Sequence, residues 1–185
     1  MPGVNGGIEM RDTRWQLRYL QAVAALVVAA GEALAQDRQP ARRIVVSIPD
    51  RKLALVEDGR VVKVYPVAVG AAATPSPLGD FTVIDRVMHP TWYGPHKVAP
   101  PGKRNPLGPR WIGLSRKGYG IHGTSNPRSI GHAASHGCIR MNNSDVEELF
   151  GLVAVGDAVE LVAEPSDEVA RLFGGAPATM VAGGQ

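Results

Sequence analysis

The sequence has one cysteine, few aromatic side chains and no long apolar run after its first thirty residues. Cys138 is the only cysteine among 185 residues, so no disulfide can form within the chain. Phe, Trp and Tyr make up 5% of the residues, so a hydrophobic core must consist mainly of Val, Ile, Leu and Ala. No basic stripe carries interleaved aromatics and no zinc-finger spacing occurs, so no nucleic-acid partner is predicted.

Glycine and proline are abundant instead, with 22 and 15 residues respectively. This composition favours short strands joined by turns over long helices. The length fits one domain with tails. The formal net charge of +3 is mild and suits weak attraction to an anionic polymer or envelope.

The first 35 residues have the three parts of a secretory signal peptide. Three arginines between positions 11 and 18 precede an apolar run over 19–30, and an A-x-A site ends at Ala35. The apolar run is shorter than the roughly 20 residues that a membrane span needs. The sequence therefore predicts cleavage after Ala35, export to the periplasm or cell wall, and a mature form with no stable membrane span. An uncleaved anchor or a core helix is the alternative.

Residues 42–163 are predicted to form one mainly β domain, preceded by a linker over 36–41 and followed by a tail over 164–185. The expected architecture is a β-sandwich or open barrel with one short helix over 143–150, capped by Asn143 or Ser144 and ended by Gly151. A further short helix over 166–173, capped by Ser166, is possible from the pattern. Strands are predicted over 43–47, 52–57, 60–69, 80–87, 111–114 and 120–122, with a last strand or hairpin over 153–162.

Residues 88–110 form a long segment rich in proline and glycine that also carries Trp92 and Tyr93. Long loops in compact domains are often lids or binding loops. The segment is predicted to cover a substrate site, with the two aromatic side chains lining it. Simple packing of these aromatics under the loop is the alternative.

The segment 121–141 contains the cysteine, three of the five histidines and three glycines. Attack of a thiolate on a carbonyl needs a thiol, a base, oxyanion donors and open access. Cys138 supplies the thiol, His122 is a candidate base, and Gly137 leaves room beside the thiol. The backbone N–H groups of Gly137 and Cys138 are candidate oxyanion donors, and Arg140 is a candidate to bind a substrate carboxylate.

The residue types alone leave other readings open. His132 and His136 are rival bases, because His136 and Cys138 would share one face of an extended segment. A zinc site of the His₃Cys type could be formed by His122, His132, His136 and Cys138. A buried structural cysteine is a third possibility.

The same residues resemble a known family, the L,D-transpeptidases of bacterial cell walls with a YkuD-type catalytic domain. The resemblance rests on His122-Gly123 followed by Ser135-His136-Gly137-Cys138-Ile139-Arg140, on the connecting positions between them, and on the stretch 77–81. It covers about residues 42–163. It implies that Cys138 is the acylated residue and His122 the proton acceptor and donor, oriented by the carbonyl of Gly123. It also implies no cofactor or metal, and a role for His136 in the local structure of the oxyanion loop.

The resemblance further implies peptidoglycan tetrapeptide stems as substrate. The acceptor of the acyl group is a second stem, giving a 3→3 cross-link, the lysine of a wall lipoprotein, or water. With water the enzyme would be an L,D-carboxypeptidase. A different exported cysteine peptidase and a wall-binding domain without catalysis are the remaining alternatives.

Overall fold

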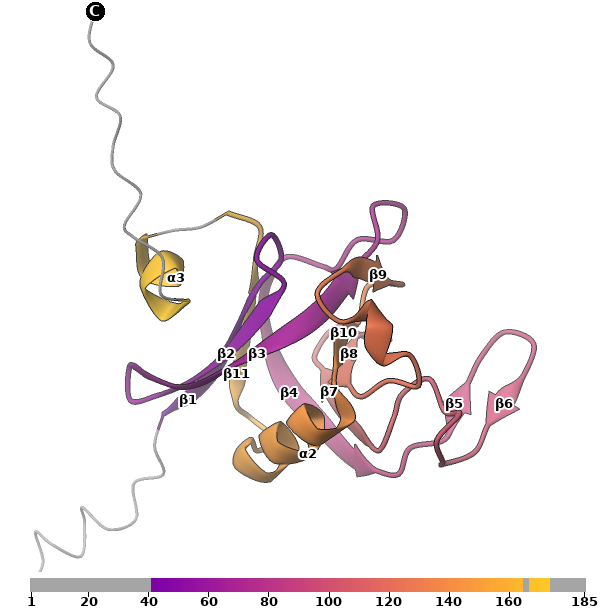
Figure 1. Cartoon of the computed structure of the whole chain (residues 1–185). Helices are drawn as coiled ribbons and strands as arrows, with labels where there is room; N and C mark the ends of the chain where they lie inside the picture. The colour runs from indigo at the N-terminus through magenta and orange to yellow at the C-terminus, as the bar shows by residue number, and fades with distance from the viewer. Residues whose placement is uncertain (1–40, 165–166, 174–185) are drawn as a thin grey trace, which may run out of the picture. The chain divides into compact units, whose positions relative to one another are not determined.

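The structure is a computed structural model that describes residues 41–164 and 167–173, and strands dominate these ranges (Figure 1). The predicted signal peptide, its cleavage site and most of the C-terminal tail lie outside the described residues. The helices are η1 (Pro127–Ser129), α2 (Asn143–Leu152) and α3 (Asp167–Leu172). The strands are β1 (Arg42–Ser47), β2 (Lys52–Glu57), β3 (Arg60–Gly70), β4 (Gly79–Met88), β5 (Trp92–Tyr93), β6 (Val98–Ala99), β7 (Arg110–Leu114), β8 (Gly120–His122), β9 (Ala133–Ser135), β10 (Ile139–Met141) and β11 (Ala158–Val162).

The main sheet closes on itself. Its strand order is β10-β8-β7-β4-β11-β1-β2-β3-β9, and β10 also pairs with β3. This extra pairing joins eight strands into a barrel-like ring and leaves β9 beside β3. Strands β5 and β6 form a separate two-stranded sheet that projects from the barrel (Figure 1). The pairing of β10 with β8 matters for the site because it brings the strand that follows Cys138 against the strand that carries His122.

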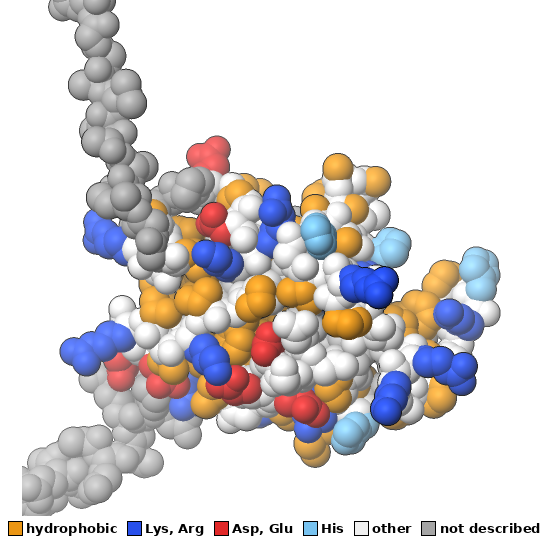
Figure 2. Space-filling model, in the orientation of Figure 1, with side chains coloured by type: hydrophobic (Ala, Val, Ile, Leu, Met, Phe, Trp, Pro, Cys, Tyr) orange, Lys and Arg blue, Asp and Glu red, His pale blue; other side chains and the backbone are white. Residues whose placement is uncertain are grey.

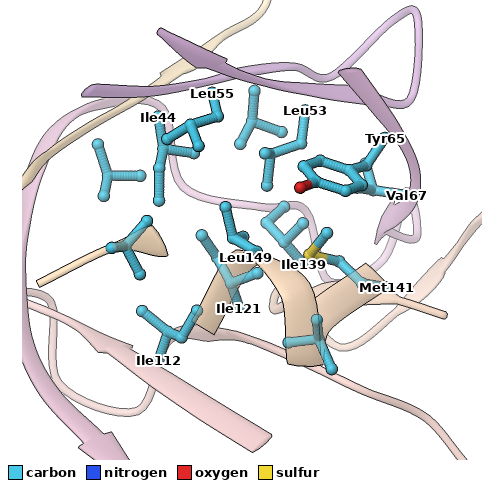
Figure 3. Close-up of a cluster of buried hydrophobic side chains, with 14 of the residues drawn as sticks. Ile44, Leu53, Leu55, Tyr65, Val67, Ile112, Ile121, Ile139, Met141 and Leu149 are labelled. Carbon is cyan, nitrogen blue, oxygen red and sulfur yellow. The ribbon is translucent and has the colours of Figure 1, made fainter. Parts of the chain in front are cut away.

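The core lies inside the ring and is filled by aliphatic side chains from the strands and from α2. Figure 3 shows side chains of β1, β2, β3, β7, β8 and β10 directed toward Leu149 of α2. Strands β1 and β2 are buried on both faces, because Val45, Ala54 and Val56 pack on their outer side against Val169 of α3. Alternate residues of a strand point to opposite faces, so this second cover explains why each strand has a run of consecutive apolar residues, 44–46 in β1 and 53–56 in β2.

The predicted fold class is confirmed, and most strands occur where the sequence pattern indicates them. The hairpin between β2 and β3 turns at Asp58 and Gly59, both with positive φ (47° and 77°), as a two-residue hairpin favours. The predicted helix over 143–150 is longer than expected: it continues through Gly151 to Leu152, and its N-cap is Asn142. The segment 153–162 contains a single strand, β11, that pairs with β1 and β4.

Four short strands were missed by the sequence pattern: β5, β6, β9 and β10 each have two or three residues. No periodicity can be detected over so few positions. They form because neighbouring strands offer unpaired backbone groups, which is a long-range effect. No helix among the described residues combines the length and apolar character needed to cross a bilayer.

A buried hydroxyl in the core yields a stability prediction. The Tyr65 hydroxyl has no hydrogen-bond partner among the described residues, and burial, reinforced by Glu148 and Asp145, raises the pKa of Tyr65 to about 12. Because an unpaired buried polar group is costly, Tyr65→Phe should raise the free energy of unfolding by about 1 kcal/mol. Urea denaturation measures the change. Tyr65→Leu, which also removes the ring, should lower the free energy of unfolding. A Tyr65→Phe variant less stable than the unsubstituted protein would contradict the expectation.

Candidate active site

Two parallel strands bring the predicted nucleophile and base together. In the pairing of β10 with β8, Arg140 lies opposite His122, and Cys138 immediately precedes β10. His122 and Cys138 line one cavity of about 270 Å³, together with Ser135, His136 and Arg140. All the reactive side chains singled out in the sequence except His132 therefore face the same hollow.

His122 is buried, with 5% of its surface exposed, and its orientation is set by its neighbours. Its Nδ1 lies 2.6 Å from the carbonyl oxygen of Gly123. A carbonyl oxygen can only accept, so Nδ1 carries the proton and Nε2 is left as the basic nitrogen. The ring of Trp111 stacks on the imidazole, with centroids 5.7 Å apart and planes inclined by 22°.

The same surroundings control the charge of His122. Burial lowers its pKa to about 4, with a smaller lowering from the charge of Arg140, while the hydrogen bond to Gly123 acts in the opposite direction. Loss of hydration penalises the charged form of any buried group. The imidazole is therefore neutral at pH 7 and available as a base.

Cys138 is partly exposed, and its thiol is held by backbone groups. Sγ donates to the carbonyl of Gly118 at 3.6 Å. Burial raises the pKa of the Cys138 thiol, and a backbone hydrogen bond from Gly120 and the charge of Arg140 lower it to a lesser extent. The resting pair is thus a neutral thiol and a neutral imidazole. In a pair of this kind, the thiol proton moves as the sulfur attacks a carbonyl and not before the attack.

The turn before the cysteine is fixed by Ser135, a buried residue of β9. Its hydroxyl donates to the carbonyl of Cys138 at 2.6 Å and accepts from the N–H of Gly137 at 3.0 Å. The N–H of Gly137, expected to be an oxyanion donor, therefore already has an acceptor. Gly137 itself has φ of +109°, and a Cβ there would lie 2.6 Å from the ring of Tyr119.

A segment between β3 and β4 braces this turn from outside. The carbonyl of Ser135 accepts both from the N–H of Ala71 and from the hydroxyl of Thr74, each at 3.0 Å. The Ser76 hydroxyl accepts from the N–H of Gly70 at 2.8 Å and holds the segment to β3. The sequence pattern did not predict these hydrogen bonds. It indicated only that Thr74 and Ser76 belong to a turn beside Pro75.

Asn143 supports the histidine in a similar way and was also missed. Its side-chain oxygen accepts from the N–H of Thr124 at 2.8 Å. A Cβ on either Gly108 or Gly123 would come within 2.5 Å of that oxygen, so both glycines are needed for the close approach. Asn143 thereby positions the peptide of Gly123, whose carbonyl holds His122. The only sequence signal was its place at the start of a helix.

The remaining histidines of the motif are exposed. His136 lines the cavity, whereas His132 does not, which weakens its claim to be a base. Across residues 41–164 and 167–173, no group of three or more His, Cys, Asp or Glu side chains is arranged to hold a metal ion. The His₃Cys alternative therefore has no support from the arrangement of its four side chains.

The segment 88–110, called the lid after its predicted role, contributes residues to the cavities beside Cys138. Trp92, Tyr93 and Leu107 line a second cavity of about 410 Å³ that also reaches Trp111 and Cys138. The lid is organised by buried Asn105, whose amide donates to the carbonyls of Pro90, Ala99 and Pro100 and whose oxygen accepts from the N–H of Leu107. This amide holds an otherwise irregular loop in one shape.

Comparison with known proteins agrees with this geometry. The sequence profile of the YkuD family, described as the L,D-transpeptidase catalytic domain, matches residues 41–161. The chain belongs to this family. This match confirms the resemblance that rests on the motifs around Cys138 and His122. The L,D-transpeptidases are a class of enzymes.

The relatives of this chain include two proteins from Bacillus that are named putative L,D-transpeptidase YkuD. The protein of Bacillus licheniformis is 44% identical over 119 residues, and that of Bacillus subtilis is 44% identical over 118 residues. Each match covers 64% of this chain and 64% of the relative. The chain therefore spans slightly less than two thirds of the length of these relatives.

Solved structures match the same fold. The catalytic domain of the Enterococcus faecium L,D-transpeptidase, determined by NMR, is 27% identical with a TM-score of 0.55, covering 65% of this chain and 96% of that one. An L,D-transpeptidase of Mycobacterium tuberculosis has a TM-score of 0.58 at 22% identity, covering 66% and 58%. At 22% identity, the similarity to the Mycobacterium tuberculosis structure shows only a shared fold.

Proposed function

We propose that this L,D-transpeptidase acts on tetrapeptide stems of peptidoglycan through an acyl thioester on Cys138. The observation that carries the proposal is the shared cavity of Cys138 and His122, with Nδ1 of His122 bound to the Gly123 carbonyl and Nε2 left basic. A nucleophile, a base and a group that orients the base are the parts of a thiol acyltransferase site.

In the first half of the reaction, Sγ of Cys138 attacks the carbonyl of a meso-diaminopimelate–D-alanine bond. Nε2 of His122 takes the thiol proton as the carbon–sulfur bond forms. The tetrahedral intermediate collapses when the carbon–nitrogen bond breaks and His122 gives its proton to the departing D-alanine amine. Because the N–H of Gly137 is occupied by Ser135, the oxyanion is assigned to the N–H of Cys138, with Arg140 supplying positive charge nearby.

In the second half, an amine attacks the thioester carbonyl and His122 accepts the proton of that amine. The thiolate of Cys138 leaves and is reprotonated by His122, which restores the neutral pair. An amine of a second stem gives a 3→3 cross-link, and a lipoprotein lysine gives an anchored lipoprotein. The proposal includes export through the predicted signal peptide to the periplasm or cell wall, where the thioester conserves the energy of the cleaved peptide bond.

A single experiment tests the role of Cys138. The protein and its Cys138→Ala variant are incubated with disaccharide-tetrapeptide, and intact protein and products are followed by mass spectrometry. We expect an adduct on Cys138, release of D-alanine and cross-linked dimers, with turnover by the variant lower by at least about 10⁴-fold. D-alanine without dimers would assign an L,D-carboxypeptidase or a lipoprotein acceptor. No adduct and no D-alanine from a folded protein would overturn the proposal.

A further inference from the structure

Charge is divided sharply along the chain. Residues 86–144 contain nine Lys and Arg and all five histidines, but no Asp or Glu. The other described residues, 41–85 with 145–164 and 167–173, contain seven Lys and Arg and thirteen Asp and Glu. The segment that bears the active site and its lid is therefore strongly cationic, although the net charge of the whole chain is small.

The division is also visible on the surface. In Figure 2 the side of the molecule that carries β5 and β6 shows blue and pale blue side chains and no red ones, while red side chains gather on the rest of this face. Arg110, at the end of the lid, pairs with Glu147 at 3.5 Å, but on the side around β5 and β6 this view shows no carboxylate beside the cations. Such a surface attracts anions and orients their approach.

Four of these cations line two neighbouring hollows. Lys97 and Arg140 line the cavity that holds Cys138. A neighbouring hollow of about 580 Å³ is lined by residues 97–106, which include Lys103 and Arg104. Lys97 and Pro106 belong to both walls. We call these two neighbouring hollows, lined by Arg140, Lys97, Lys103 and Arg104, the cationic trough.

Within the described ranges, none of these four side chains forms an ion pair. Lys97 has only an aromatic neighbour, with Nζ 5.8 Å from the centre of the Trp92 ring. Like charges gathered in one hollow repel each other unless an anion lies between them. The trough also offers room for more than one anion, since its cations are divided between two cavities.

We infer that the cationic trough binds a peptidoglycan strand through several carboxylates, those of stems neighbouring the one that reacts. This inference rests on the proposed function and extends it: the preferred substrate is the polymer, held by the lid, and not an isolated stem. A polymer with carboxylates at intervals can contact several cations at once. Because these carboxylates belong to one polymer, each contact strengthens the binding of the others.

Binding to intact peptidoglycan tests the trough independently of turnover. The test uses the Cys138→Ala protein and purified peptidoglycan freed of phosphodiester polymers, with co-sedimentation at low and high salt. In that background, Lys103→Gln with Arg104→Gln should weaken binding by about fivefold at low salt, because two exposed charge contacts are lost. High salt should remove most of the difference.

The matched control is Arg51→Gln with Lys52→Gln, which removes two adjacent exposed cations at the turn between β1 and β2 and changes the net charge equally. It should change binding less than twofold. Equal weakening by both pairs, no weakening by the lid pair, or tighter binding of poly(glycerol phosphate) than of peptidoglycan would each overturn the inference. Failure to release D-alanine would overturn only the proposed function, since the binding comparison needs no turnover.

Discussion

His122→Ala should lower kcat/KM for the disaccharide-tetrapeptide by on the order of 10³-fold, because a positioned base typically contributes 10²–10⁴-fold. The imidazole of His122 is the buried one, with Nδ1 tied to Gly123 and Nε2 left as the base. Steady-state D-alanine release measures the loss. A melting curve of the variant confirms that the fold survives removal of a buried ring.

The rival base provides the matched control. His136 lines the same cavity but is exposed, so His136→Ala should cost less than about tenfold. If the two variants were equally impaired, or if His136→Ala were the worse, the assignment of His122 as base would be wrong.

The pH profile should separate a neutral pair from a preformed ion pair. Because the pKa of His122 is lowered to about 4 and that of Cys138 is raised, kcat/KM should stay level from about pH 5 to pH 8 and fall only below this range, as the imidazole becomes protonated. A thiolate–imidazolium pair would instead lose activity as pH rises through the imidazolium pKa. If kcat/KM already fell as the pH was lowered from about 8 to about 6, His122 would have an ordinary pKa.

Gly137→Ala should lower kcat/KM by about 10²-fold or more while leaving most of the fold intact. The added Cβ would meet the ring of Tyr119 at 2.6 Å and the carbonyl of Pro75 at 3.3 Å, at a φ of +109° that side chains rarely adopt. Relief requires movement of the turn that carries the thiol, and a displacement of about 1 Å can cost 10²-fold in rate. The acylation rate, followed by mass spectrometry, is the relevant measurement.

Gly131→Ala is the control for backbone strain alone. Gly131 has φ of +84°, and nothing lies within 4 Å of an added Cβ. It should show a similar loss of stability, about 1–2 kcal/mol, but much less loss of activity. Equal activity losses in the two variants would mean that the close approach at Gly137 has no special importance.

The sequence alone determined the family and the mainly β class, and it predicts Cys138 as the nucleophile. These followed from local information: the motif around Cys138 and His122, and periodic strands such as Lys52–Glu57 that occur as predicted. The long loop over 88–110 was likewise predicted as a lid. Such features can be read from neighbouring residues because strand alternation and turn chemistry act over a few positions.

The tertiary structure alone decided how the site operates. The pairing of β10 with β3 and β8, the engagement of Gly137 by Ser135, and the support of Gly123 by Asn143 all join residues whose relation no local pattern encodes. The neutral state of the Cys138–His122 pair follows from burial, which depends on every element that packs over it. The cationic trough likewise exists only because residues of the lid, held by Asn105, lie beside the cavity that Cys138 lines.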